Sequence, residues 1–560
     1  AFFGSLALLI AGNGFFKPNI STIVGSLYPA GSPKRDSGFT LFYMGINLGA
    51  AMSPLLCGYV GETYGWHYGF GLATVGMLTG LTVFVAPIRV TQIVIAIGAL
   101  AGAGALVVLR PDNPLSFVVN LFVGAALLFA AVVSWIALAR GGLPLGAGAP
   151  PDLVKLRAPS VLKVLTVERA IYVGTLLVVP VLALVVSGFS PFTADHAPLV
   201  LFSESVIARL SQSPNAFEQI LGVVVKEVSK PAGLILAVTG MVALGYLGKQ
   251  MLRLARPERE RMQVVLILTF FSMLFWSFFE QAGSSINNFT DRNVDRVGVA
   301  RVVNEADVGR TVRLQPTQAQ IGHENAGRMF TMRDLDDLRA KHTADLQFEI
   351  DWQVGPSNLG MAVARRSDEV PASVFQSTNP ILILLFGLVF TALWTYLGQR
   401  GREPSTPFKF AMGLLQLGLG FGAIWLGTKS ADSRGMVAAG WLLLGYFLHT
   451  SGELCLSPVG LSMITRMTPR LLVSTVMGTW FLATAFSQYL AAIISQFTGV
   501  GHGGGDDKTV PIPRETLHVY GTVFGKIALF ALLSAAVCFL LIPVLKRWMH
   551  EEKDNAQVGV

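Results

Sequence analysis

The chain has 560 residues, of which 52% are hydrophobic and only 14% are charged. This composition lies on the apolar side of soluble proteins and predicts a polytopic membrane protein. A net charge of +8 would suit a nucleic-acid-binding protein, but the basic residues lie mostly in short loops between apolar segments. Cys57, Cys455 and Cys538 all lie inside apolar runs, so we expect neither a disulfide framework nor a metal site.

Apolar segments long enough to cross a bilayer follow one another along the chain. They lie near residues 1–27, 39–60, 66–88, 91–109, 115–139, 170–187, 231–248, 263–283, 378–398, 408–428, 435–465, 471–497 and 520–545. We therefore predict an all-α membrane protein with about thirteen transmembrane helices.

The basic loops predict the orientation of the chain. If the loop with Lys34 and Arg35 is cytoplasmic, strict alternation places every other short basic loop on the same side. The C-terminal tail is then cytoplasmic as well, and we expect the protein to lie in the inner (plasma) membrane. Two long polar segments, residues 187–230 and 284–378, fall on the opposite side.

Residues 287–377 are polar, carry many charges and have little apolar periodicity. They predict either a small domain outside the membrane or an unstructured insert. Their arginines are interspersed with Asp and Glu, which favours an ordinary solvated surface, so we expect no nucleic-acid partner.

One carboxylate interrupts an otherwise apolar segment. Trp441 to Arg466 is long enough to span the bilayer, yet Glu453 lies near its middle, beside Gly452 and before Pro458. An ionised Glu facing hydrocarbon costs at least about 3 kcal/mol, so Glu453 must face a water-filled cavity, bind a cation or hold a proton. The alternative is a pair with a lysine from another helix that serves packing alone.

Other polar and aromatic residues recur within the spans at a spacing of four, which places both members of a pair on one helix face. The pairs are Tyr43 with Asn47, Trp276 with Glu280, and Trp480 with Thr484. Each pair could line a ligand cavity or only join helices. Lys17 could bind a carboxylate or exchange protons, or extend to the membrane surface. Asn379 could cap its helix or contact a substrate.

These residues lie in strings that resemble the proton-dependent oligopeptide transporter family of the major facilitator superfamily. The strings are GNGFFKPN at 12–19, FTLFYMGINLGA at 39–50, FWSFFEQAGSS at 275–285, FQSTNP at 375–380, REPSTPFKFAMGL at 402–414, SGELCLSPVGLSMIT at 451–465 and MGTWFLATA at 477–485. The resemblance covers roughly residues 1–88, 230–286 and 371–545. It implies a major facilitator superfamily helical bundle.

The resemblance also implies a function and a site. The residues that match the family's peptide cavity are Lys17, Tyr43, Asn47, Trp276, Glu280, Asn379, Glu453, Trp480 and Thr484. Lys17 and Glu453 would serve the peptide ends and the proton, and Glu280 is a further expected proton-coupling residue. The implied activity is symport of protons with di- and tripeptides by alternating access. The proton gradient would drive it without a cofactor, and a monomer would be sufficient.

The resemblance divides the chain into parts. The expected parts are the remainder of the first transporter half (1–90, family helices four to six), an insert with four apolar helices (91–250), the first helix of the second half (251–286), a polar insert (287–377), the other helices of the second half (378–547) and the tail (548–560). The family's first three helices, with their Glu-x-x-Glu-Arg motif, have no counterpart here. We therefore expect this sequence to be an N-terminally truncated form of a longer protein.

Three other functions remain as alternatives. Relatives within the same family move nitrate or other small solutes, so the same fold could carry another cargo. A membrane-anchored binding or scaffold protein could act through residues 287–377. An intramembrane enzyme is the third, but no nucleophile–base set or metal-ligand spacing is present in the sequence, so we expect no enzymatic activity.

Overall fold

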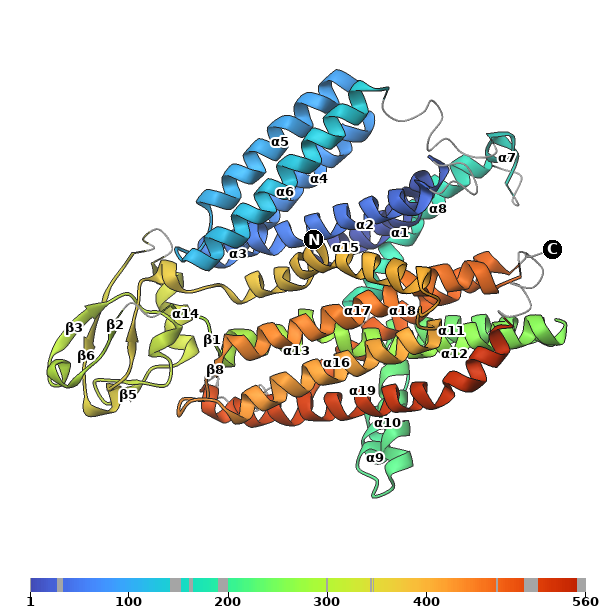
Figure 1. The fold of residues 1–560 in the computed structure, drawn as a ribbon. Coiled ribbons are helices and arrows are strands. Elements are labelled where there is room, and N and C mark those ends of the chain that lie inside the picture. Colours follow the sequence, from blue (N-terminus) through green and yellow to red (C-terminus); the bar gives the residue numbers. More distant parts are fainter. Residues whose placement is uncertain are drawn as a thin grey trace. The chain divides into compact units, whose positions relative to one another are not determined.

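A computed structural model of the chain describes residues 2–27, 34–141, 153–160, 165–189, 200–298, 301–342, 345, 347–469, 472–497 and 512–550. The described residues are mostly helical, as predicted, and Figure 1 labels the elements in chain order. The chain divides into two compact units, Ala1–Tyr43 with Gly141–Leu252, and Met44–Arg140 with Arg253–Val560.

The first unit is built from helices. They are α1 (Phe2–Ser26), the start of α2 (Lys34–Ser53), α7 (Leu153–Arg157), α8 (Val167–Ser187), α9 (Glu204–Ser211), α10 (Ala216–Val228) and α11 (Pro231–Met251). Helix α1 packs against α8. At the N-terminus of α8, the Thr166 side chain accepts a hydrogen bond from the Arg169 N–H, and the helix ends at Gly188, whose φ of 67° is accessible to glycine at little cost.

The second unit holds the remaining long helices and a domain inserted between them. The helices and turns outside that domain are η1 (Pro54–Gly58), α3 (Tyr59–Tyr64), α4 (Trp66–Val85), α5 (Ile88–Val108), α6 (Pro114–Ala139), α12 (Arg256–Phe279), η2 (Glu280–Gly283), α13 (Ser285–Asn293), η7 (Ala372–Ser377), α15 (Thr378–Gln399), α16 (Thr406–Lys429), α17 (Ala439–Met467), α18 (Val473–Gln496) and α19 (Pro513–Met549).

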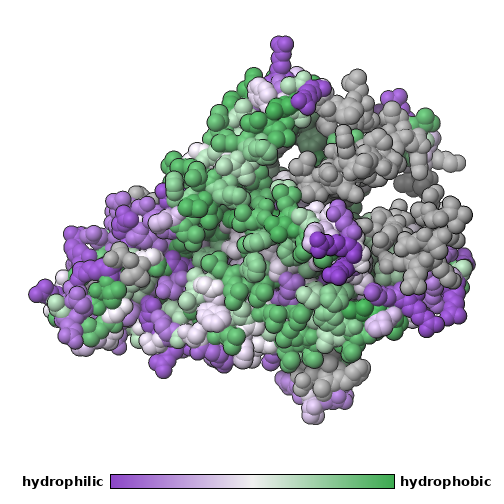
Figure 2. Space-filling model, viewed as in Figure 1, coloured by the Kyte–Doolittle hydropathy of each residue, from purple (hydrophilic) through white to green (hydrophobic). Residues whose placement is uncertain are grey.

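The surface of these helices is apolar. Among the described residues, ten helices are long and apolar enough to cross a membrane. Large side chains such as Ile97, Leu100, Phe129 and Leu540 are largely exposed, and Figure 2 shows hydrophobic residues covering much of the helical surface. Exposed leucine and isoleucine at this density are stable in contact with lipid rather than water. The fold is therefore that of a polytopic membrane protein, while the count of about thirteen spans stays a prediction.

Glycines bring α16 and α17 into close contact. A methyl group at Gly452 would lie 2.7 Å from the Gly413 carbonyl oxygen, and one at Gly420 would lie 2.9 Å from the Gly445 carbonyl oxygen. Small residues at such contacts allow helix backbones to approach closely, which is a principal source of packing energy between helices in membranes. This contact fixes the part of α17 that carries Glu453.

Residues 294–371 form a separately folded part, which we call the inserted domain. Its elements are β1 (Val294–Asp295), β2 (Arg301–Val302), η3 (Glu305–Asp307), β3 (Thr311–Leu314), η4 (Gln318–Gln320), β4 (Glu324–Asn325), β5 (Arg328–Met329), α14 (Met332–Lys341), β6 (Ile350–Gln353), η5 (Pro356–Asn358), β7 (Ala362–Val363) and η6 (Arg366–Asp368). The antiparallel pairs are β2–β7, β3–β6 and β4–β5, and β1 pairs in parallel with β8 (Val437–Ala438). Of the two predicted possibilities, a small domain is the one observed.

The inserted domain has its own hydrophobic core. The core residues are Val303, Leu314, Ile321, Phe330, Leu335, Trp352, Val354 and Met361. Trp352 is completely buried and packs edge-to-face with Phe330 at 5.4 Å between ring centroids. In Figure 2 the surface of this domain is mostly hydrophilic, unlike that of the helices. The domain is therefore built as a water-exposed module.

The observed domain is shorter than the polar insert predicted at residues 287–377. The first residues of the predicted insert belong to α13 instead. In α13, Ile286 and Phe289 are buried, and Phe289 contacts Tyr520 and Phe524 of α19. At the other end η7 leads directly into α15. Both flanks are therefore helical extensions of the membrane-spanning part.

A buried ionic cluster holds the inserted domain together. The Glu369 carboxylate accepts from Arg339 Nη2 at 2.6 Å and from the Gln318 N–H at 3.1 Å, and Arg296 Nη1 lies 3.7 Å away. Burial raises the pKa of Glu369, but the guanidinium groups of Arg339 and Arg296 and these hydrogen bonds outweigh it and hold the pKa below its ordinary value. Glu369 therefore remains charged and compensates Arg339 and the buried Arg296, which also pairs with Asp291 at 2.9 Å.

We expect Glu369→Gln to destabilise the inserted domain by about 3 kcal/mol, because the substitution removes the carboxylate shared by Arg339 and the buried Arg296 and leaves Arg296, among the described residues, only its ion pair with Asp291 at 2.9 Å. Hydrogen exchange of β3 and β6 in the complete protein measures this change as faster exchange. Asp337→Asn is the matched control, because the Asp337 side chain is 62% exposed and its pair with Arg333 contributes little.

The wild-type contribution of Glu369 should also depend on pH. Because its pKa is lowered in the folded state, the stabilisation is complete above the ordinary value of 4.5 and is lost as the pH falls through the folded-state pKa. Equal exchange in both variants and the wild type would contradict the role of Glu369.

Candidate functional site

Glu453 lies near the middle of α17 and is buried. Nδ2 of Asn379, the second residue of α15, donates to Glu453 Oε2 at 2.8 Å and to Thr450 Oγ1 at 3.0 Å. The Thr450 hydroxyl in turn donates to the Tyr446 carbonyl oxygen at 2.8 Å. We call Asn379, Thr450 and Glu453 the carboxylate cluster.

The cluster joins two helices that are distant in sequence. Both hydrogens of the Asn379 amide are used, which fixes the orientation of this side chain. A hydrogen bond to a charged acceptor is stronger than one between neutral groups, so the amide offsets part of the cost of burying the Glu453 carboxylate. The arrangement can hold a charged carboxylate, and a proton or a ligand cation can compete for it.

The start of α15 positions Asn379. The preceding turn η7 is closed by the Ser377 hydroxyl, which donates to the Val374 carbonyl at 2.6 Å, and Pro380 lies in the first turn of α15, where proline is tolerated. The structure shows neither predicted role of Asn379, because its amide nitrogen donates to two side chains of α17; contact with a substrate stays a prediction.

Aromatic residues of α12 lie beside the cluster. Trp276 contacts Phe279 at 5.1 Å between ring centroids, and Phe279 lies 6.4 Å from the ring of His449, the residue before Thr450. His449 is buried. The predicted residue Trp276 is therefore linked to α17 through Phe279.

Trp480 and Thr484 both lie on α18. Trp480 is buried against α17, because a methyl group at Gly460 would lie 2.5 Å from its ring. The Thr484 hydroxyl donates to the Trp480 carbonyl oxygen at 3.3 Å within the same helix. Trp480 therefore contributes to the packing of α18 against α17. Contact of Trp480 and Thr484 with a substrate stays a prediction.

Glu280 lies in a different local structure from the one predicted. The predicted helix over residues 263–283 ends at Phe279, and Glu280 begins the turn η2. Its neighbour Gln281 is completely buried and donates to the Ala491 carbonyl of α18 at 3.0 Å, while accepting from the Ser285 hydroxyl at 2.6 Å. Gln281 thus fixes this turn against α18, a role that its sequence position did not indicate.

The remaining predicted site residues are Asn47, Tyr43 and Lys17. Asn47 is buried in α2 within the second unit. Tyr43 and Lys17 belong to the first unit, and the Lys17 side chain lies outside the described part of the structure. Their roles in peptide binding stay predictions.

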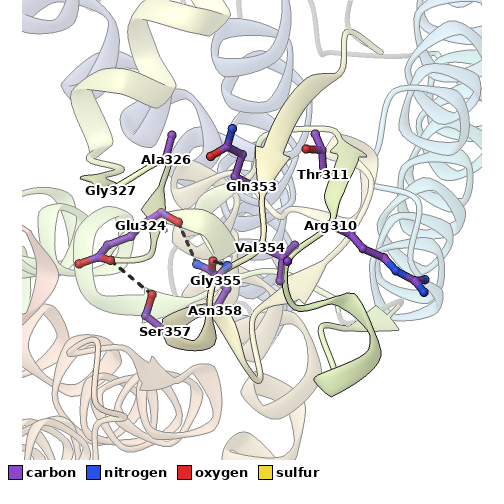
Figure 3. Close-up of a pocket in the computed structure, with 11 residues that line it drawn as sticks. Arg310, Thr311, Glu324, Ala326, Gly327, Gln353, Val354, Gly355, Ser357 and Asn358 are labelled. Carbon is purple, nitrogen blue, oxygen red and sulfur yellow. Dashed lines mark hydrogen bonds between the residues drawn. The ribbon is translucent and has the colours of Figure 1, made fainter.

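A second candidate site is a cavity of about 430 Å³ in the inserted domain (Figure 3). Its polar groups largely bond to one another. Glu324 accepts from the Ser357 hydroxyl at 3.4 Å, and the Asn358 amide donates to the Glu324 carbonyl oxygen at 3.0 Å. In Figure 3 the Arg310 side chain extends away from Glu324. The two opposite charges on its wall therefore do not converge on one ligand position.

The described residues include no group of three or more His, Cys, Asp or Glu side chains that could hold a metal ion. The carboxylate cluster contains one carboxylate, one amide and one hydroxyl. Its chemistry is therefore that of hydrogen bonding and proton exchange.

Comparisons with known proteins identify the family. The family model described as the POT family (PTR2) matches residues 1–135 and 359–508, half of the chain. The chain is 28% identical over 549 residues to the uncharacterized transporter YclF of Bacillus subtilis (strain 168), covering 98% of this chain and 75% of that protein. It is 25% identical over 556 residues to the peptide transporter YePEPT of Yersinia enterocolitica, covering 99% and 76%. It is also 24% identical over 559 residues to dipeptide and tripeptide permease A of Cronobacter turicensis, covering 99% and 76%.

Solved structures show the same fold. The crystal structure of peptide transporter POT in complex with sulfate has a TM-score of 0.52 and 25% identity, covering 97% of this chain and 75% of that chain. A POT family transporter in complex with a thioalcohol-conjugated peptide has a TM-score of 0.53 and 19% identity, covering 95% and 74%. Because the family model matches half of the sequence and the described helices adopt the same fold, this chain belongs to the POT family.

Proposed function

We propose that this protein is a secondary active transporter that couples the entry of protons to the uptake of di- and tripeptides by alternating access. Relatives over nearly the whole chain are named as a peptide transporter and as dipeptide and tripeptide permeases. The apolar helical surface supports a multi-pass location in the plasma membrane. The arrangement of basic loops supports a cytoplasmic C-terminus.

The observation that carries the proposal is the buried Glu453 carboxylate held by Asn379. A peptide with charged ends loses hydration when it enters a membrane protein, and opposite charges in the cavity offset that cost. Glu453 offers such a charge to the amino end of a peptide. A proton and the peptide then compete for one carboxylate, which makes protonation and occupancy interdependent.

The proton gradient supplies enough free energy. One proton moving down a potential of 100 mV contributes about 2.3 kcal/mol, which corresponds to roughly fifty-fold accumulation of a neutral cargo. Neither a cofactor nor ATP is required. We assign Lys17 to the carboxyl end of the peptide and Glu280 to proton transfer, as the family resemblance implies, and the aromatic and polar side chains of Tyr43, Asn47, Trp276, Trp480 and Thr484 to the cavity wall.

Uptake into proteoliposomes with an acidic exterior tests this function. We expect uptake of a labelled dipeptide that unlabelled di- and tripeptides inhibit and that nitrate does not. Inhibition by nitrate without inhibition by peptides would assign another cargo to the same fold. Transport that survives deletion of the inserted domain would dismiss the scaffold function.

We predict that Glu453→Gln abolishes proton-driven accumulation of dipeptide while peptide exchange across the membrane continues. Glutamine mimics the protonated carboxyl in size but cannot release a proton, and exchange does not require this step. Accumulation and counterflow in the same proteoliposomes measure the two activities. Glu227→Gln is the control, because Glu227 is a largely buried carboxylate paired with Lys230 at 2.7 Å in the first unit. It should leave coupling intact, and normal accumulation by a folded Glu453→Gln protein would refute the assignment.

We predict that Asn379→Ala impairs coupling more than stability. The substitution removes the amide that orients and compensates Glu453, at a cost of about 1–3 kcal/mol. The control is Asn120→Ala, because Asn120 is a buried asparagine whose amide donates to the Leu106 carbonyl at 2.7 Å and joins α5 to α6. Accumulation divided by exchange rate is the measurement. A ratio lowered equally in both variants would show that Asn379 serves packing alone.

A further inference from the structure

The inserted domain and the turn after it contact a group of helices from the early part of the chain. The contacts are the Ser373 N–H to Glu62 Oε1 at 2.9 Å, Arg366 Nη2 to the Thr63 carbonyl at 3.4 Å, the Asp112 N–H to the Ser367 carbonyl at 2.7 Å, and Arg365 Nη2 to Asp112 Oδ2 at 3.1 Å. We call these contacts the seam. Every residue involved lies within the second unit.

The early helices form one group. Leu48 and Leu55 from α2 and η1 pack with Leu106 of α5 and Val123 of α6 in one buried cluster, against which Val374 of η7 and Ile381 and Leu384 of α15 also pack. The family model also runs without a break over residues 1–135. On the proposed function, this α2–α6 group moves with the first transporter half. The seam therefore joins the inserted domain to the first half.

A second set of contacts joins the inserted domain and the residue before it, Asn293 of α13, to the second half. They are the Asn293 amide to the Gly435 and Pro513 carbonyls at 3.0 and 2.8 Å, the Thr516 hydroxyl to Asn293 Oδ1 at 3.0 Å, Arg434 Nη1 to the Ala319 carbonyl at 2.8 Å, and the β1–β8 ladder of Val294 with Val437 and Asp295 with Ala438. We call these contacts the anchor. They reach the start of α17 and the start of α19.

The anchor is the stronger attachment. Asn293 is completely buried with three hydrogen bonds, and breaking them would leave buried polar groups unsatisfied. Near Arg434, burial and then the charge of Arg434 lower the pKa of His323 to about 4.

The seam is the weaker attachment. The side chains of its ion pair, Arg365 with Asp112, are 61% and 57% exposed, and such pairs contribute about 0–1 kcal/mol. The hydrogen bond of Arg366 to Thr63 is long, and among the described residues Nη1 of Arg366 is buried without a hydrogen-bond partner. These two polar contacts are therefore weaker than those of Asn293, and we expect the seam to open before the anchor.

We propose that the inserted domain is a latch on the transport cycle: it moves as a rigid part of the second half, and its seam with Glu62, Thr63 and Asp112 opens and re-forms once in each cycle. The two halves of such transporters rock about a midplane site, so contacts that bridge them on one face must break when that face opens. The inserted domain bridges them, and the unequal strength of its two attachments selects where the break occurs.

Crosslinking of the two attachments tests the latch. In a background without the native cysteines, Asp112→Cys with Ser367→Cys closes the seam, and Asp295→Cys with Ala438→Cys closes the anchor. Each cysteine pair is joined either by oxidation to a disulfide or by a short bifunctional thiol reagent. Uptake of labelled dipeptide is measured before and after bridging. For the disulfide it is measured again after reduction. We expect near-complete bridging of the seam to lower uptake at least about tenfold, reversibly for the disulfide, while the anchor crosslink leaves uptake within about twofold.

The outcomes separate the latch from the proposed function. Absence of dipeptide uptake in the uncrosslinked proteins contradicts peptide transport itself. Normal uptake with a fully bridged seam overturns the latch, and so does an equal loss from the anchor crosslink.

A distance measurement tests the latch without transport. Spin labels at Asp337 of the inserted domain and Tyr68 of α4 report across the seam, and labels at Asp337 and Lys429 report across the anchor; all three positions are exposed. We expect two distance populations across the seam, which shift on addition of dipeptide or acid, and one population across the anchor. A single unchanging population across the seam would overturn the proposal.

Discussion

A carboxylate buried among membrane-spanning helices must be compensated by hydrogen bonds, a cation or a proton, and Glu453 imposes this requirement on the second unit. The compensation begins with the amide of Asn379, which reaches from the start of α15 to the middle of α17. The close contact of Gly452 with Gly413 holds this part of α17 against α16. The carboxylate therefore has a fixed position, and a change in its charge alters the balance of forces between α15 and α17.

The inserted domain is stabilised by different physics. Its strands have only two to four residues, and its stability depends on a hydrophobic core around Trp352 and on the buried pairing of Glu369 with Arg339 and Arg296. A rigid water-exposed module of this kind can transmit force between helices without taking part in substrate binding. It is attached to the helices by buried hydrogen bonds at Asn293 and by an exposed ion pair at Asp112.

The sequence predicted the helices well, because an apolar run of about 20 residues has few alternatives to a membrane span. It also identified Glu453, because an intramembrane charge is costly wherever its helix lies. The sequence did not pair Asn379 with Glu453, and it left two possible roles for Asn379. The two residues are 74 positions apart in the chain, so no local pattern joins them. Gln281 and Thr450 were not assigned, because a buried amide or hydroxyl in an apolar helix has the same local sequence whether it packs or functions.

The fold of residues 294–371 was not predictable from periodicity. Strands of two residues produce no alternating pattern, and the short helix α13 has only Ile286 and Phe289 to mark its buried face. The ionic cluster required long-range contacts, because Arg296, Arg339 and Glu369 come from three separate segments. Local sequence described this segment as charged and polar, which was correct for its surface and uninformative about its interior.

In the proposed function, the movement of peptide and the movement of protons are coupled through one protein. The most direct test of this coupling is the internal pH of proteoliposomes that contain a trapped pH-sensitive dye and are buffered weakly inside. When dipeptide is added outside without any imposed gradient, we predict acidification of the interior that begins with peptide entry and is proportional to the amount of peptide taken up. Peptide entry with no change in internal pH would contradict the account.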